Sequence, residues 1–137
     1  MVEQNKKAVE EKYFMLQLMD AQLKEIEKEL GALEQRSLEL VKLKSSLDSL
    51  AQTNPGSASI APLGLGTYAF SELKDPKHVL VNVGSGVLVK KDINSAKDLI
   101  NVQLQESDKA AAQLSQNMHT LIIRAQQIET EIKELLE

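Results

Sequence analysis

The chain of 137 residues contains no cysteine and no tryptophan, and these absences exclude several classes of protein. Without cysteine there is no disulfide framework, no thiolate nucleophile and no cysteine-based zinc site. Aromatic residues make up only 3% of the chain and charged residues 26%, a balance that suits long helices better than a compact core. The lack of cysteine is also compatible with a reducing compartment.

The sequence also lacks long apolar runs and any concentration of basic charge. No segment approaches the ~20 apolar residues that a membrane-spanning helix needs, and the start, MVEQNKKAVEEK, lacks the apolar stretch of a signal peptide. The formal net charge is -4, carried by interspersed glutamate and lysine, whereas phosphate binding requires a concentrated basic surface. We therefore expect a soluble protein whose partners include neither a membrane nor a nucleic acid.

Two segments of nearly equal length, Val9 to Leu50 and Ile93 to Leu135, carry apolar residues at alternating steps of three and four. This spacing is the heptad seam of a coiled coil, and two successive steps of four near Ile100 unwind it only locally. Either Leu43 or Lys44 completes the first seam. If the two helices pair in antiparallel fashion, residues whose numbers sum to about 143 face each other. The seam positions are Leu16, Met19, Leu23, Ile26, Leu30, Leu33, Ser37, Leu40, Leu47 and Leu50, followed by Ile93, Ala96, Ile100, Leu104, Ser107, Ala111, Leu114, Met118, Leu121, Ala125, Ile128, Ile132 and Leu135.

Between the helices the pattern changes to short strands. The proline, glycine and serine of residues 53–59 end the first helix near Leu50 or Ala51. Asp92 or Asn94 can cap the second helix. Four β-type runs follow the first helix: Ile60 to Leu63, Thr67 to Leu73, His78 to Val83 and Val87 to Lys91.

The turns G-L-G and G-S-G fall at the same offset from their strands, so the strands form two similar hairpins whose glycines supply positive φ. The predicted fold class is α+β: a long antiparallel two-helix coiled coil with two central β-hairpins. We expect a single domain over 1–137, with helices over 1–52 and 93–137 and the hairpins over 53–92.

No constellation of residues predicts catalysis. The glycine-rich turns each lead into a strand, whereas a dinucleotide site needs a helix N-terminus after the glycines. His78 and His119 lie far apart, without a serine or carboxylate at a diagnostic spacing, and no Glu-x-x-His pair supports a metal site. We expect no catalytic residue, no bound metal and no cofactor.

The hairpins predict an oligomer. Isolated hairpins are marginal in water, and their edges carry unpaired backbone donors and acceptors. We therefore expect several subunits to pool their strands in a shared barrel or sheet, from which each coiled coil projects. A helix of about 44 residues, rising ~1.5 Å per residue, would reach ~65 Å. The residues assigned to assembly are Ile60, Leu63, Tyr68, Phe70, Val79, Val81, Val83, Val87 and Val89.

The distal end of the coiled coil carries more apolar side chains than a two-helix seam can bury. Three methionines lie in this half, and methionine adapts to unlike partners. Two interpretations remain open: a surface that binds other proteins, or a thicker core where the helices end. The cluster consists of Tyr13, Phe14, Met15, Leu16, Leu18, Met19, Met118, Ile122 and Ile123.

The central sequences APLGLGTYAFSEL and HVLVNVGSGVLVKKDINSAKDLI resemble the α-class subunit of prefoldin, and in that family two hairpins instead of one distinguish the α class from the β class. The resemblance implies a cytoplasmic hexamer of two α-class and four β-class subunits, built on a double β-barrel with six coiled-coil arms. It also implies ATP-independent capture of unfolded client proteins at the arm tips and their delivery to a cytosolic chaperonin. The alternative is a homo-oligomeric coiled-coil scaffold or filament without client delivery. A third possibility, an enzyme that uses the barrel as a scaffold, is disfavoured because the strand sequences contain no coherent set of polar or titratable residues.

Overall fold

The computed structural model describes residues 2–137. Helix α1 (Val2–Ala51) is followed by strands β1 (Ala58–Gly64), β2 (Thr67–Glu72), β3 (His78–Asn82) and β4 (Leu88–Asp92), and helix α2 (Ile93–Leu136) ends the chain. By its internal contacts the chain divides into two compact units. The arm unit joins the chain up to Arg36 with Glu106–Glu137, and the hairpin unit is Ser37–Gln105. The assignment of residues 1–137 to a single domain stays a prediction.

The inner ends of both helices fall where the sequence predicts them. Helix α1 closes at Ala51, and both the amide and the hydroxyl of Thr53 donate to the Leu50 carbonyl oxygen, at 3.0 and 2.7 Å. Before α2, Asp92 Oδ1 accepts a hydrogen bond of 2.7 Å from the Ser95 amide. Asp92 is therefore the N-cap, because its carboxylate satisfies a first-turn donor that the helix cannot pair. Asn94 already lies inside the helix.

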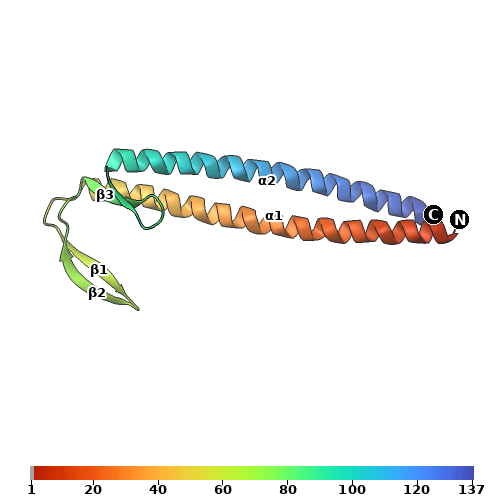
Figure 1. Cartoon of the computed structure of the whole chain (residues 1–137), viewed down its shortest axis with the longest axis horizontal. Coiled ribbons are helices and arrows are strands. Elements are labelled where there is room, and N and C mark those ends of the chain that lie inside the picture. The colour runs from red at the N-terminus through yellow and green to blue at the C-terminus, as the bar shows by residue number, and fades with distance from the viewer. Residues whose placement is uncertain (1) are drawn as a thin grey trace. The chain divides into compact units, whose positions relative to one another are not determined.

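In the arm unit, α1 and α2 lie side by side in antiparallel orientation (Figure 1). Ile128 is fully buried and Ile132 nearly so, and both occupy seam positions of α2. Lys12 Nζ lies 2.6 Å from Glu131 Oε2, and the two residue numbers sum to 143 as the predicted pairing requires. The seam thus sets the register of the two helices in this unit.

The hairpin unit has its own small core. Leu40 and Leu47 of α1 pack with Ile93, Ala96 and Ile100 of α2. Lys44 Nζ donates a hydrogen bond of 3.0 Å to Asn101 Oδ1 on the opposite helix. Lys44 therefore takes the seam position that the sequence left open between Leu43 and Lys44, and Leu43 stays exposed. The seam position accommodates a lysine because the aliphatic part of the side chain packs between the helices while the ammonium group is hydrogen-bonded.

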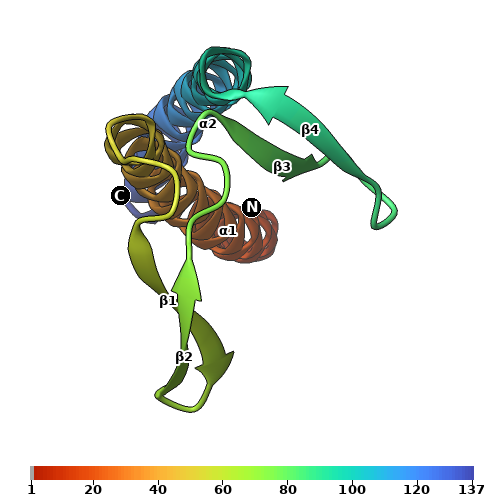
Figure 2. The ribbon, with the colours of Figure 1, turned by 90° about the vertical axis from the view of Figure 1, so that its left-hand side faces the viewer.

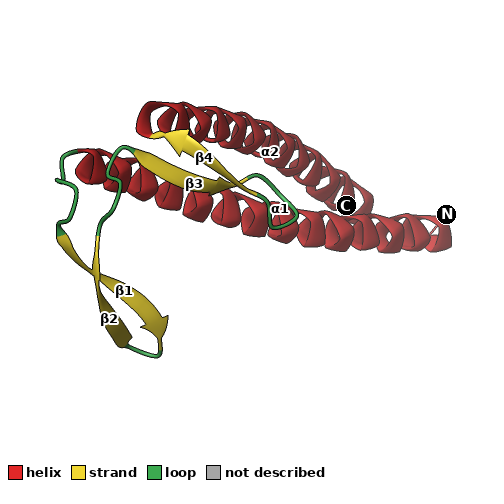
Figure 3. Ribbon diagram, turned by 60° about the vertical axis from the view of Figure 1, so that its left-hand side comes forward, coloured by secondary structure: helices red, strands yellow, loops and turns green. Residues whose placement is uncertain are grey.

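The four strands form two separate antiparallel hairpins, β1–β2 and β3–β4, and no third strand borders either within residues 2–137 (Figures 2 and 3). The predicted strands are confirmed with small shifts at their ends. Strand β1 starts two residues earlier than predicted, at Ala58, and β4 lies one residue later, at Leu88–Asp92. Hydrogen bonds from Leu73 N to Ser57 O and from Ile93 N to Lys77 O extend the pairing beyond the hairpins' open ends.

The two hairpin turns have nearly the same backbone conformation, which confirms the internal repeat. Gly64 and Gly84 have φ of 110° and 119°, and Gly66 and Gly86 have φ of 75° and 74°. The residue between the glycines, Leu65 in one turn and Ser85 in the other, also has positive φ, at 50° and 51°. The sequence pattern did not predict this, because a left-handed conformation is uncommon for residues other than glycine.

Candidate assembly and client-binding surfaces

The first hairpin presents one apolar face that nothing in its unit covers. Ile60 pairs with Phe70 and Pro62 with Tyr68 across the strands, so these four side chains share a face. Phe70 is 98% exposed, and Ile60 and Tyr68 are exposed as well. The opposite face carries the small residues Ser59, Ala61, Ala69 and Ser71. An uncovered aromatic face beside a face of small side chains is suited to burial against another protein.

The two edges of this hairpin differ in their backbone donors. Leu73 N donates a hydrogen bond to Ser57 O, so this position is of the hydrogen-bonded kind, which alternates with a non-bonded kind along antiparallel strands. The pairs of Ile60 with Phe70 and of Pro62 with Tyr68 are therefore of the non-bonded kind, so their backbone groups point away from the hairpin. The outer edge of β2 keeps the amides of Tyr68 and Phe70, whereas the outer edge of β1 lacks a donor at Pro62. Leu63, also exposed, lies in the register shift that follows Pro62.

The second hairpin is partly covered by its own chain. Val81 pairs with Val89, and Val79 and Val81 pack against the core formed by the helix ends. The sequence pattern predicted that strands of other subunits would cover this valine face, but Val79 and Val81 are already partly buried against the helices of their own unit. Val83, Val87 and Val89 remain exposed.

Sequence reasoning missed the opposite face of the second hairpin, where Leu80 and Leu88 are exposed. Leu80 also belongs to the lining of an apolar groove of the hairpin unit, together with Leu43, Leu47 and Ile100 of the helices. The signal was present in the run V-L-V, where a leucine lies between two valines of the inner face. Successive side chains of a strand point to opposite faces, so an interpretation based on the valine face alone overlooks Leu80 on the other face.

At the arm end, the nine predicted residues divide into two groups. Leu16, Met19 and Met118 occupy the seam between the helices and are half-buried. The other six are exposed, Phe14 at 60%, because their heptad positions lie beside or opposite the seam. The exposed group consists of Tyr13, Phe14, Met15, Leu18, Ile122 and Ile123.

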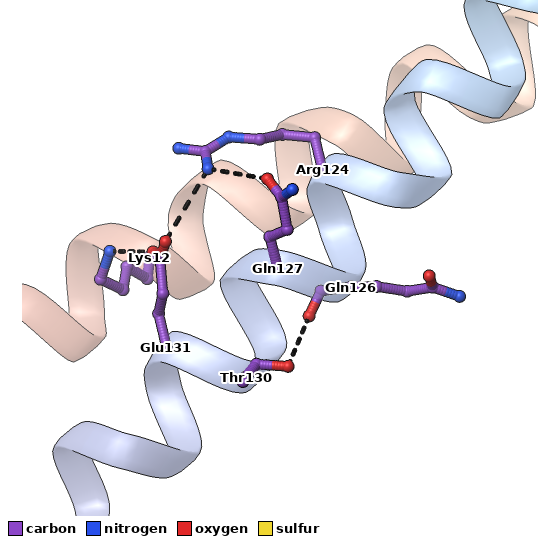
Figure 4. Close-up of polar contacts among 6 residues, drawn as sticks. All are labelled: Lys12, Arg124, Gln126, Gln127, Thr130 and Glu131. Carbon is purple, nitrogen blue, oxygen red and sulfur yellow. Dashed lines mark hydrogen bonds and ion pairs between the residues drawn. The ribbon is translucent and has the colours of Figure 1, made fainter.

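An ion-pair cluster joins the helices next to these residues (Figure 4). Glu131 accepts a hydrogen bond from Lys12 at 2.6 Å, and Arg124 Nη1 lies 3.8 Å from its second oxygen. The Lys12 hydrogen bond, helped by the positive charges of Lys12 and Arg124, lowers the pKa of Glu131 below its usual range. Arg124 also donates to Gln127 Oε1 at 3.4 Å. Polar contacts therefore stabilise the flank of the seam while apolar side chains point outward.

Asp75 organises the loop between the hairpins. Its Oδ1 accepts the Lys77 amide at 2.9 Å, and its Oδ2 lies 2.9 Å from His78 Nδ1 and 4.0 Å from Lys90 Nζ. The hydrogen bond from the Lys77 amide, followed by the contact with His78, lowers the pKa of Asp75. Sequence reasoning found no carboxylate partner for His78. The structure supplies one three residues earlier, in an exposed Asx turn that fixes the start of β3.

Within residues 2–137, no three His, Asp or Glu side chains gather in a way that would hold a metal ion. Neither helix in this part of the chain is long and apolar enough to cross a membrane.

Comparison with known families matches the chain to the prefoldin subunit model over residues 19–137. The chain belongs to the prefoldin family. Curated relatives place it in the α class. Prefoldin subunit alpha of Archaeoglobus fulgidus is 23% identical over 93% of both chains, and that of Methanobrevibacter smithii is 32% identical over 66% of this chain and 67% of its own.

A solved structure confirms the fold. One chain in the cryo-EM structure of filamentous PFD from Methanocaldococcus jannaschii superposes with a TM-score of 0.77 and 19% identity, covering 84% of this chain and 95% of that one. The predicted α+β fold of two long helices and two small hairpins is therefore confirmed, as is the resemblance to α-class prefoldin. Prefoldin is a family of chaperones, not of enzymes, and its subunits assemble with other prefoldin subunits.

Proposed function

We propose that two copies of this chain, as α-class subunits, and four β-class subunits form a cytoplasmic prefoldin hexamer. The hexamer captures unfolded proteins without ATP and passes them to a cytosolic chaperonin. The observation that supports this proposal best is the placement of exposed apolar side chains in a chain of the prefoldin family. They concentrate on the hairpins and at the arm end, which are the places where assembly and client capture require them.

Assembly is assigned to the strands. The aromatic face of β1–β2 and the exposed valines and leucines of β3–β4 are apolar surfaces next to unpaired strand edges. Burial of such surface, together with hydrogen bonding along the edges, drives strands of different subunits to join. Of the nine predicted assembly residues, Ile60, Tyr68 and Phe70 are the best suited, because they share the exposed face of β1–β2.

Client capture is assigned to the exposed members of the arm-end cluster. Non-native chains expose apolar segments, and weak contacts from several arms add through avidity. Exposure supports the binding interpretation for the six exposed members, whereas the half-buried positions suit the helical seam. The exposed members are Tyr13, Phe14, Met15, Leu18, Ile122 and Ile123, and the half-buried ones are Leu16, Met19 and Met118. We therefore assign the two interpretations left open by the sequence to different residues.

An aggregation assay tests the proposal. A chemically denatured model protein is diluted without ATP into buffer, into this chain alone, or into this chain with a β-class partner, while light scattering and oligomer mass are followed together. We expect suppression of scattering that requires the mixed assembly. Replacement of Phe14, Met15, Leu18 and Ile123 by serine is expected to reduce suppression with the oligomer mass unchanged. A mixed assembly that leaves aggregation untouched contradicts client capture.

A second candidate is a homo-oligomeric scaffold or filament. It is favoured by the filamentous assembly from which the structural neighbour comes, and by the unpaired edges of both hairpins. This alternative predicts that the chain alone forms large assemblies, visible by negative-stain electron microscopy, without any effect on aggregation.

A further inference from the structure

The two units of the chain differ in charge. The arm unit contains 14 Asp and Glu residues against nine Lys and Arg residues, whereas the hairpin unit contains six against seven. The acidic excess of the chain therefore belongs to the arm unit, which also carries the exposed apolar cluster.

Part of this excess lies beside the most exposed aromatic residue of the arm. Phe14 and Met15 line an open concavity with Lys7, Glu10 and Glu11. Within residues 2–137, neither Glu10 nor Glu11 takes part in an ion pair. Lys12, the next residue along α1, is engaged by Glu131 on α2, which also attracts Arg124. Glu131 thus holds two nearby cations. The charged side chains that line the concavity are Glu10 and Glu11 against the single cation Lys7, so the rim of the apolar surface keeps a negative excess.

From this arrangement we propose that the arm end prefers unfolded segments in which apolar residues are flanked by lysine or arginine. The proposal rests on the proposed client-binding function. Apolar contact with Phe14 and Met15 supplies affinity for many sequences, and the carboxylates of Glu10 and Glu11 discriminate among them by charge. Because these charges are exposed, salt screens the discrimination but leaves the apolar contact intact.

The test uses two fluorescent peptides with one apolar core, flanked in one by lysines and in the other by glutamates. Binding to the assembled complex is measured by anisotropy at low salt (about 20 mM) and high salt (about 0.5 M). At low salt we expect the lysine-flanked peptide to bind roughly fivefold more tightly, as a few exposed ion pairs allow. At high salt the two affinities should converge. Replacing Glu10 and Glu11 by glutamine should remove the preference, whereas the matched control, Glu27→Gln with Glu29→Gln farther along α1, should keep it.

The outcomes separate this inference from the proposed function. Equal binding of both peptides at low salt by a complex that still suppresses aggregation overturns the charge preference alone. A preference that survives in the Glu10 and Glu11 variant overturns the assignment to this rim. Failure to bind either peptide, together with unsuppressed aggregation, overturns both proposals.

Discussion

Replacing Phe70 by serine should separate folding from assembly. In the single chain Phe70 is 98% exposed, so the substitution removes almost no packing and should leave the fold intact. If the aromatic face is buried between subunits, each copy loses about 2–3 kcal/mol of apolar burial, which lowers the association constant about a hundredfold. We therefore expect wild-type helix content by circular dichroism and a shift to smaller species at micromolar concentration in sedimentation velocity.

The matched control is Phe14→Ser, the same chemical change at a residue that is 60% exposed on the arm. This variant should assemble like the wild type and lose part of its client capture. If Phe70→Ser assembles at the same protein concentration as the wild type, the aromatic face of β1–β2 lies outside the interface and the prediction is refuted. Loss of helix content in Phe70→Ser would show instead that the side chain supports the fold of the chain itself.

Three further predictions concern the fold. Ile128→Ala removes a side chain that is fully buried in the arm seam, and should cost roughly 3 kcal/mol and lower hydrogen-exchange protection there; unchanged protection would argue against a packed seam. Two Gly→Ala substitutions should have opposite signs: Gly31→Ala, in helical backbone with open space around it, should raise the melting temperature by removing a flexible residue, whereas Gly84→Ala should lower it because φ of 119° is strained for alanine. The hydrogen bond from the Ser95 amide is the main cause of the lowered pKa of Asp92 in the folded chain. Ionised Asp92 therefore stabilises the fold fully above its unfolded pKa of about 4, and this stabilisation is lost as the pH falls through the lower folded pKa. Thermal melts of Asp92→Asn should accordingly show a weaker loss of stability on acidification than the wild type, and parallel acid limbs would count against the cap.

The sequence alone determined the helices and strands and how they pair, because both depend on the spacing of residues that are close together in the chain. Steps of three and four specify a heptad seam, and the contact of Lys12 with Glu131 has the predicted pairing. Glycine pairs between alternating runs specify hairpin turns, and both turns lie where they were expected. The family resemblance also rests on these local sequences.

Only the tertiary structure decided which apolar residues are available to a partner. Val81 and Phe70 look alike as alternating strand residues, yet Val81 packs against the helix ends and Phe70 is uncovered. Leu43 and Lys44 were equal candidates for the seam until a hydrogen bond to Asn101 placed Lys44 there. Periodicity gives the face on which a residue lies, but burial depends on which distant segment reaches that face, and that is a property of the folded chain.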